Sequence, residues 1–250
     1  MTDIKDIAEK KPHLRDILRI YEKALEFNRV VAGIEGNITG CEARSYPPEA
    51  VDRIFQAFSG IFDLPVDIMV PLKEAMGLGQ VDLSRLPLNE SPAFSLPYNE
   101  DELSGILFLL GRPYFFGVRD SCNVGELGWE DAKCIVCNST PSLASIDKEG
   151  RRRLHCSFCG TSGYFRRTGC PVCLGADTSK TNIITIEDEK GFRIDTCDAC
   201  NSYWKTIDSE VLAAMPPDLA DIVSLPLDII AQGRGYTRHS PNPIGLVKIT

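Results

Sequence analysis

Eight of the ten cysteines of this 250-residue chain form four Cys-x-x-Cys pairs within one stretch. Two cysteines at this spacing can turn both sulfurs toward one ion from a single tight loop, and two such loops complete a tetrahedral shell of four thiolates. The four pairs therefore predict two metal sites. The paired residues are Cys134/Cys137, Cys156/Cys159, Cys170/Cys173 and Cys197/Cys200.

An internal repeat indicates which loops share an ion. Residues 142–147 and residues 181–186 each form a strand-like run that is followed by a turn and a returning segment. In both copies the turn glycine, Gly150 or Gly191, stands six residues before the next cysteine. We therefore expect two β-hairpin modules, one holding an ion with the first four paired cysteines and one with the last four. The alternative, in which the two adjacent middle loops share an ion, ignores this repeat.

A closed shell of four thiolates has no open coordination position, so it cannot activate water as a catalytic zinc does. With iron the same shell can pass one electron between ferrous and ferric states. Because tetrahedral thiolate suits both metals, the spacing leaves iron and zinc open for each of the two ions. Structural disulfides are the alternative to metal. Three functions follow: a metal-stabilised binding protein, a one-electron carrier and a redox-active dithiol protein.

No other motif in the sequence carries comparable chemistry. Glycine-rich phosphate loops, Gly-x-Ser-x-Gly and His-Glu-x-x-His are absent from the sequence, so we expect no catalytic residues and no enzyme. His155 adjoins a paired cysteine but is interpreted as an ordinary strand histidine. Cys41 and Cys122 stand alone and are interpreted as buried, unreactive thiols.

Charge and hydropathy exclude two classes of partner. The formal net charge is -8, and ligating thiolates add to it, so general binding of nucleic acid is not expected. Arginine runs at residues 151–153 and 166–167 are interpreted as offsetting the charge of the sulfur-rich sites. The N-terminus is too charged for a signal peptide, and no apolar run approaches the ~18–20 residues of a membrane span. A cytoplasmic location is expected, and it agrees with reduced thiols.

The first half of the chain is expected to be helical. Apolar residues at helical spacing predict an amphipathic helix over residues 12–27, followed by a glycine-containing connection over residues 30–40. Pro48 is expected to open a second helix, and Pro71 a short third one.

Prolines and an N-cap residue predict the boundaries of the remaining elements. Residues 77–98 carry several prolines and are expected to be extended. Asn99 is a good N-cap for a further helix, which Pro113 is expected to limit. Beyond the cysteines, residues 208–232 are expected to form two helical pieces broken by a Pro-Pro pair. The tail from residue 233 onward is expected to be either strapped down or mobile.

These elements predict an α+β fold. A helical N-terminal region is followed by two tandem modules of the rubredoxin-like or zinc-ribbon type, and by a C-terminal helical segment that packs back on the body. The predicted boundaries are residues 1–128, 129–168, 169–207 and 208–250.

Several motifs, taken in order, resemble the formate dehydrogenase accessory protein FdhE family. The resemblance covers the chain from about residue 134 to residue 243 and, in the N-terminal region, is limited to helical character. The motifs that carry it are residues 154–159, 169–173, 197–205, 218–220, 232–236 and 240–243.

This resemblance implies a cytoplasmic maturation factor with two rubredoxin-like metal modules, in which the eight paired cysteines correspond to iron-binding positions of the family. It also implies a partner, the catalytic subunit of a molybdenum- or tungsten-dependent formate dehydrogenase during assembly. We therefore expect a non-enzymatic assembly chaperone. Whether the chain also forms a homodimer is left open by the sequence.

Overall fold

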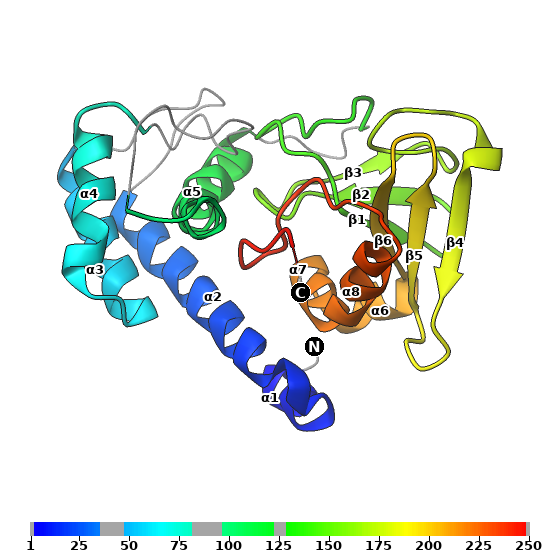
Figure 1. Cartoon of the computed structure of the whole chain (residues 1–250), viewed down its shortest axis with the longest axis horizontal. Helices are drawn as coiled ribbons and strands as arrows, with labels where there is room; N and C mark the ends of the chain where they lie inside the picture. Colours follow the sequence, from blue (N-terminus) through cyan, green and yellow to red (C-terminus); the bar gives the residue numbers. More distant parts are fainter. Residues whose placement is uncertain (1–2, 36–47, 82–96, 123–128, 249–250) are drawn as a thin grey trace.

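The structure is a computed structural model that describes residues 3–35, 48–81, 97–122 and 129–248. The helices over residues 48–77 and 100–122 lie toward one end of the molecule, and a sheet with three short helices forms the other end (Figure 1). The helix over residues 15–35 runs between them, so that the first helix of the chain lies beside the C-terminal helices. The described helices of the first half are α1 (Ile4–Lys10), the 3-10 helix η1 (Pro12–Leu14), α2 (Arg15–Glu35), α3 (Pro48–Phe62), α4 (Val66–Gly77) and α5 (Glu100–Cys122).

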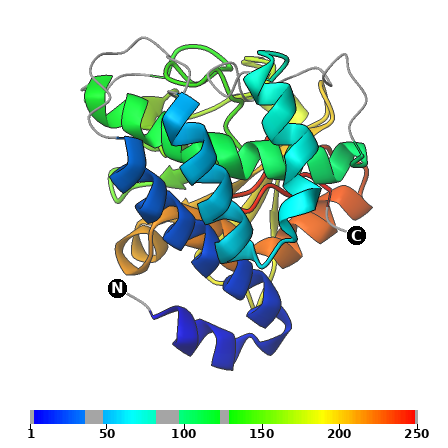
Figure 2. The same ribbon diagram turned by 90° about the vertical axis from the view of Figure 1, so that its left-hand side faces the viewer.

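The helices of the first half bury apolar stripes against one another. Figure 2 shows α3 and α4 beside α2, with α5 crossing behind them. The rings of Phe27 in α2 and Phe58 in α3 meet edge to face, with centroids 5.1 Å apart, and both side chains are fully buried. Such burial of large aromatic side chains supplies the main driving force for packing these helices. None of the described helices combines the length and the apolar character that crossing a membrane requires.

Two predictions about these helices are confirmed. A helix begins at Pro48 as expected. Asn99 caps α5 in a capping box, because its Oδ1 accepts a 2.9 Å hydrogen bond from the Glu102 N–H while Glu102 Oε2 accepts a 3.1 Å bond from the Asn99 N–H. The reciprocal bonds satisfy two N–H groups that the first turn leaves without helical partners.

Three predicted helix boundaries are wrong. Helix α2 continues to Glu35, through the start of the expected connection, α4 begins before Pro71, and α5 runs past Pro113 to Cys122. The loss of one helical hydrogen bond at Pro113 is outweighed by burial, since α5 is buried from residue 107 to residue 115. The expected extended segment over residues 77–98 lies mostly outside the described residues.

Both modules contribute three strands to one six-stranded sheet. Its order is β3-β2-β1-β6-β5-β4. All neighbouring strands pair antiparallel except β1 and β6, which pair in parallel and join the modules. The strands are β1 (Leu143–Ile146), β2 (Arg152–His155), β3 (Ser162–Phe165), β4 (Thr181–Thr185), β5 (Phe192–Cys197) and β6 (Ser202–Asp208).

The two predicted hairpins are confirmed as β1–β2 and β4–β5. Gly150 and Gly191 take φ values of 76° and 80° in their turns, a region that glycine enters without steric cost. The third strand of each module was not predicted. The two modules therefore share one continuous sheet, and the domain boundaries given above stay predictions.

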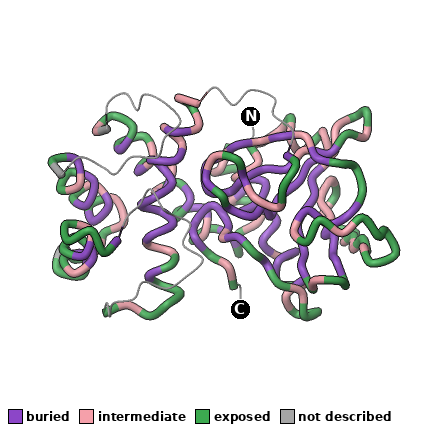
Figure 3. The backbone as a smooth tube through the Cα atoms, turned by 90° about the horizontal axis from the view of Figure 1, so that it is seen from above, coloured by how far each residue is buried: buried purple, intermediate pink, exposed green. Residues whose placement is uncertain are grey.

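Three C-terminal helices cover part of the sheet, where two were expected. They are α6 (Ser209–Ala214), α7 (Pro217–Val223) and α8 (Leu225–Gly233). The additional break falls at Ser224, directly before the Leu-Pro pair that opens α8. Leu227 and Ala231 of α8 pack on Ile194 and Tyr203 of the sheet. Figure 3 shows that buried residues run through the centre of the molecule, from the inner helices into the strands.

Candidate metal centres

The first four paired cysteines lie together, and we call this group the first site. The Sγ atoms of Cys134 and Cys159 are 3.5 Å apart, and those of Cys137 and Cys156 are 3.4 Å apart. All four sulfurs lie within 4.8 Å of one another, and all four residues are buried. One loop precedes β1 and the other connects β2 to β3. The hairpin thus brings its two cysteine loops to the same end of the sheet.

The last four paired cysteines form a matching group, the second site. Its closest cross-loop sulfurs are 3.7 Å apart for Cys170 and Cys200, and 3.9 Å apart for Cys173 and Cys197. All four sulfurs again lie within 4.8 Å of one another. The repeat in the sequence therefore predicted the grouping of the loops correctly. The described cysteines form no disulfide, and these separations far exceed the ~2.05 Å of an S–S bond.

The four cysteine loops share a backbone conformation that the sequence analysis missed. In each loop the residue directly after the second cysteine takes a positive φ, between 52° and 61° for the three non-glycine residues and 72° for the glycine. Asn and Gly tolerate this conformation best, so their recurrence after the cysteines was a readable signal. Only the third loop places a leucine there. The four residues are Asn138, Gly160, Leu174 and Asn201.

Backbone hydrogen bonds close these loops. In three of them the N–H of the first cysteine donates to a carbonyl five residues later, over 2.8 Å from Cys134 to Ser139 and 2.9 Å from Cys156 to Thr161 and from Cys170 to Gly175. Such tight loops hold both sulfurs of a pair on one side. In these three loops the backbone therefore places the two sulfurs of each pair for binding one ion.

Hydroxyl groups lie beside one sulfur of each site. Thr161 Oγ1 is 3.0 Å from Cys159 Sγ, and Ser202 Oγ is 3.1 Å from Cys200 Sγ. The two hydroxyl residues occupy equivalent positions, two residues after the last cysteine of each site. Ser202 Oγ is also 2.7 Å from Nε2 of His239. A hydrogen bond between a hydroxyl and a cysteine sulfur orients that sulfur as a metal ligand.

The electrostatics of the first site favour a cation. Hydrogen bonds with Cys137, Cys156 and Cys159 lower the pKa of Cys134 well below its ordinary value. Burial raises the pKa of Cys137 and Cys156 well above theirs. Four buried thiols thus cannot all ionise without a compensating positive charge. A tetrahedral set of four sulfurs is the donor set that zinc and iron accept, so these residues fit such an ion.

Helix α5 holds the second cysteine loop, a role that the sequence analysis did not assign. The Phe158 ring, inside that loop, lies between Phe108 and Phe115 with centroid distances of 5.1 and 5.0 Å. Arg112 Nε donates to the Phe158 carbonyl over 3.3 Å, and Arg119 Nη1 donates to the Cys159 carbonyl over 3.1 Å. The helical region therefore supports the first site directly.

His155 is an ordinary strand histidine, as predicted. It lies in β2 with Nδ1 2.7 Å from Ser162 Oγ and Nε2 2.8 Å from Ser145 Oγ. Burial lowers its pKa to about 4, so the imidazole is neutral near pH 7. Of the two lone cysteines, Cys122 is half-buried at the end of α5, and Cys41 lies outside the described residues.

One arginine from each of the two arginine runs, Arg152 and Arg166, donates to carbonyl groups around the third cysteine loop. Buried Arg152 donates from Nε to the Arg166 carbonyl over 2.9 Å and from Nη2 to the Gly169 carbonyl over 3.0 Å. Arg166 Nη2 donates to the Gly175 carbonyl over 3.2 Å. These bonds position the loop that carries Cys170, so the arginines support the second site through its backbone.

Comparisons with known proteins confirm the resemblance stated above. Residues 169–244 match the family described as FdhE, C-terminal domain. The protein FdhE homolog of Aquifex aeolicus is 32% identical over 151 residues, which cover 59% of this chain and 53% of the homolog. Protein FdhE of Escherichia coli O1:K1 is 30% identical over 122 residues, which cover 47% of this chain and 39% of that protein. The matches thus span about half the length of these relatives or less.

A solved structure shares the fold. The crystal structure of the FdhE protein from Pseudomonas aeruginosa superposes with a TM-score of 0.52 and covers 90% of this chain and 94% of that chain. The two sequences are 20% identical in this superposition. The α+β architecture of this chain is therefore that of a known fold.

Proposed function

We propose, on the premise that residues 169–244 belong to the FdhE C-terminal domain family, that this protein is an accessory protein of formate dehydrogenase. In this proposal it binds the catalytic subunit during assembly, acts as a chaperone in the cytoplasm and catalyses no reaction of its own. The family match carries the proposal. The shared fold supports it, because it extends the likeness to the helical half of the chain.

We also propose that the eight paired cysteines are metal ligands, one ion to each site. The support is geometric: two groups of four sulfurs, each within 4.8 Å, held by loops of one conformation. The ions would be iron or zinc, and they would cross-link two loops of each module. Since short hairpins are marginal alone, such ions would contribute much of the folding free energy of this half.

Association with the catalytic subunit is the direct test. Purified, metal-loaded protein is mixed with the catalytic subunit of a formate dehydrogenase, once lacking its cofactors and once fully assembled, and complex formation is followed by calorimetry. We expect binding to the incomplete subunit and weaker binding to the assembled one. The Cys134→Ser variant, with one site disrupted, is the matched control for dependence on the metal module. Absence of binding to either form contradicts the accessory role.

One observation favours a second candidate, a one-electron carrier. Cys173 is exposed in the second site, and a solvent-facing ligand shortens the path for an electron between an iron ion and a partner. An iron-loaded protein would show a visible thiolate-to-iron absorption that bleaches reversibly on reduction. A protein that holds only colourless zinc in the cell removes this candidate. The dithiol alternative is disfavoured, because Cys173 alone among the eight paired cysteines is exposed.

A further inference from the structure

The two sites differ in how far solvent reaches their sulfurs. In the first site the four cysteines are between 0% and 4% exposed. In the second site Cys170 and Cys197 are equally buried, but Cys200 is half-buried and Cys173 is exposed. An incoming ligand must reach the metal ion from the solvent side of a bound sulfur in order to displace that sulfur. The second site offers such an approach at Cys173, and the first site offers none.

A C-terminal segment closes over the first site. We call residues 237–242 the strap. Ser240 Oγ of the strap is 3.0 Å from Ser139 Oγ of the first cysteine loop and 3.3 Å from Ser157 Oγ of the second. Ser157 Oγ also donates to the Pro241 carbonyl over 2.7 Å. The strap thus bridges both loops of the first site.

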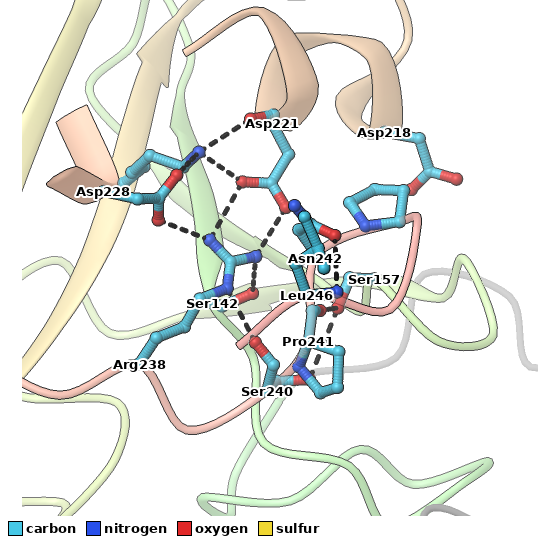
Figure 4. A network of polar contacts seen from close by, with 12 residues as sticks. Ser142, Ser157, Asp218, Asp221, Asp228, Arg238, Ser240, Pro241, Asn242 and Leu246 are labelled. Atoms are coloured by element: carbon cyan, nitrogen blue, oxygen red, sulfur yellow. Dashed lines mark hydrogen bonds and ion pairs between the residues drawn. The ribbon is translucent and has the colours of Figure 1, made fainter. Parts of the chain in front are cut away.

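A buried ion cluster anchors the strap (Figure 4). The Arg238 guanidinium is 2.6 Å from Asp221 and 2.7 Å from Asp228, and Lys205 completes the cluster at 2.7 and 2.5 Å from the same carboxylates. These four side chains are fully buried. Lifting the strap would separate Arg238 from both carboxylates, which is costly because a buried charge would lose its partner. The cover over the first site is therefore firmly held.

In the second site, the strap contacts the fourth cysteine loop of the chain. The Thr237 N–H donates to the Asn201 carbonyl over 2.7 Å, and His239 lies beside Ser202. The third loop is held instead by Arg152 and Arg166 through its backbone carbonyls. These bonds fix the loop but leave Cys173 facing solvent.

The third loop is also strained. Leu174 follows Cys173 with φ at 59°, in the left-handed region that a leucine side chain disfavours sterically. The other three loops have Asn or Gly at this position, which accept the conformation with less cost. The cross-loop sulfurs of the second site are also further apart, at 3.7 and 3.9 Å against 3.4 and 3.5 Å. The second site is therefore the less tightly built of the two.

We propose that the second site takes up and releases its metal ion through Cys173, which an incoming thiolate or chelating ligand displaces from the ion. The first site, in contrast, is closed to such ligands by α5 and the strap. This inference rests on the proposed metal binding. In the exchange step an incoming thiolate forms a bond to the ion, the bond from Cys173 Sγ to the ion breaks, and the freed Cys173 thiolate takes up the proton that the incoming thiol has lost. The first site then serves as a structural cross-link and the second as the point of metal entry and release.

Chelator kinetics on the folded, zinc-loaded protein test the proposal. The probe is 4-(2-pyridylazo)resorcinol in excess at neutral pH, and its absorbance counts the zinc released. We expect two phases of one ion per chain, at least ten-fold apart in rate. Cys173→Ser should remove the fast phase, and Cys134→Ser the slow one. A protein that holds no zinc after loading contradicts the metal sites themselves, which is a separate failure from that of the exchange proposal.

A variant of the strap provides a second test that does not depend on replacing a cysteine. Ser240→Ala keeps all eight cysteines and removes the hydroxyl that bridges the two loops, so it should speed the slow phase several-fold and leave the fast phase unchanged. Ser104→Ala, on the exposed face of α5, is the matched control and should change neither. Release of both ions in one phase, or loss of the fast phase in Cys134→Ser but not in Cys173→Ser, overturns the proposal.

Discussion

The Arg238 guanidinium lies 2.6 Å from the Asp221 carboxylate, and both side chains are fully buried. This pair joins the C-terminal strap to α7. Although burial lowers the pKa of Arg238, the carboxylates of Asp221 and Asp228 raise it above its ordinary value. The arginine is therefore charged in the folded state and depends on these two partners.

Replacing this arginine should strongly destabilise the protein. Arg238→Met leaves Asp221 and Asp228 with Lys205 as their only cation in the cluster, and breaking a buried ion pair from one side costs ~3–5 kcal/mol. Urea unfolding of the zinc-loaded protein measures the loss. Arg234→Met, at an exposed position, is the control and should leave the free energy of unfolding almost unchanged. A loss below ~1 kcal/mol for Arg238→Met would show that the cluster does not anchor the strap.

The glycine of the second cysteine loop should not tolerate a side chain. Gly160 has φ at 72°, and a Cβ there would collide with Arg119 Nη1 and lie 2.9 Å from Phe116 Cε1. Gly160→Ala should therefore destabilise the folded protein by ~2–4 kcal/mol. Gly33→Ala in α2, where a Cβ would meet nothing within 4 Å, should instead stabilise slightly. Equal thermal midpoints for the two variants would contradict the close packing of α5 on this loop.

The strain at Leu174 can be tested in both directions. Leu174→Gly should relieve ~1 kcal/mol and raise the stability of the zinc-loaded protein. Asn138→Leu, which places a leucine at the equivalent position of the first loop, should lower it by a similar amount. Both free energies come from urea unfolding at a fixed zinc concentration. Opposite signs are expected, and a loss of stability in Leu174→Gly would mean that contacts of the leucine outweigh its backbone cost.

Metal removal should unfold the sheet before the helices. Without ions, the cysteine loops beside β2 and β5 are no longer cross-linked. Helices α2 and α3, in contrast, keep their aromatic core around Phe27 and Phe58. Amide hydrogen exchange after treatment with chelator should show loss of protection in β2 and β5 and retained protection in α2 and α3. Uniform loss of protection across the chain would show that the two halves unfold as one unit.

Most features of the candidate sites could be predicted from the sequence, because they depend on the spacing of residues that are close together in the chain. The Cys-x-x-Cys spacing fixes a loop, and the six-residue interval from Gly150 or Gly191 to the next cysteine fixes a hairpin, so no long-range information was needed to group the sulfurs. The loop residues Asn138, Gly160 and Asn201 carried a further local signal of positive φ that went unused.

The remaining features depend on contacts between distant segments. Pro113 ends a helix by local rules, but burial of α5 against the second cysteine loop overrides them. The partners of Arg112 and Arg238 lie in other elements, since Arg112 bonds to Phe158 and Arg238 to Asp221. Neither arginine has a sequence signature, because the contribution of a buried charge to stability depends on the groups that surround it in the folded state.

The metal content of the purified protein tests the central claim most directly. Elemental analysis by inductively coupled plasma mass spectrometry should find two ions of iron or zinc per chain, and one each in Cys134→Ser and Cys197→Ser, because each change disrupts a different site. A folded protein without bound ions, or the loss of both ions from either single change, would contradict two separate sulfur shells.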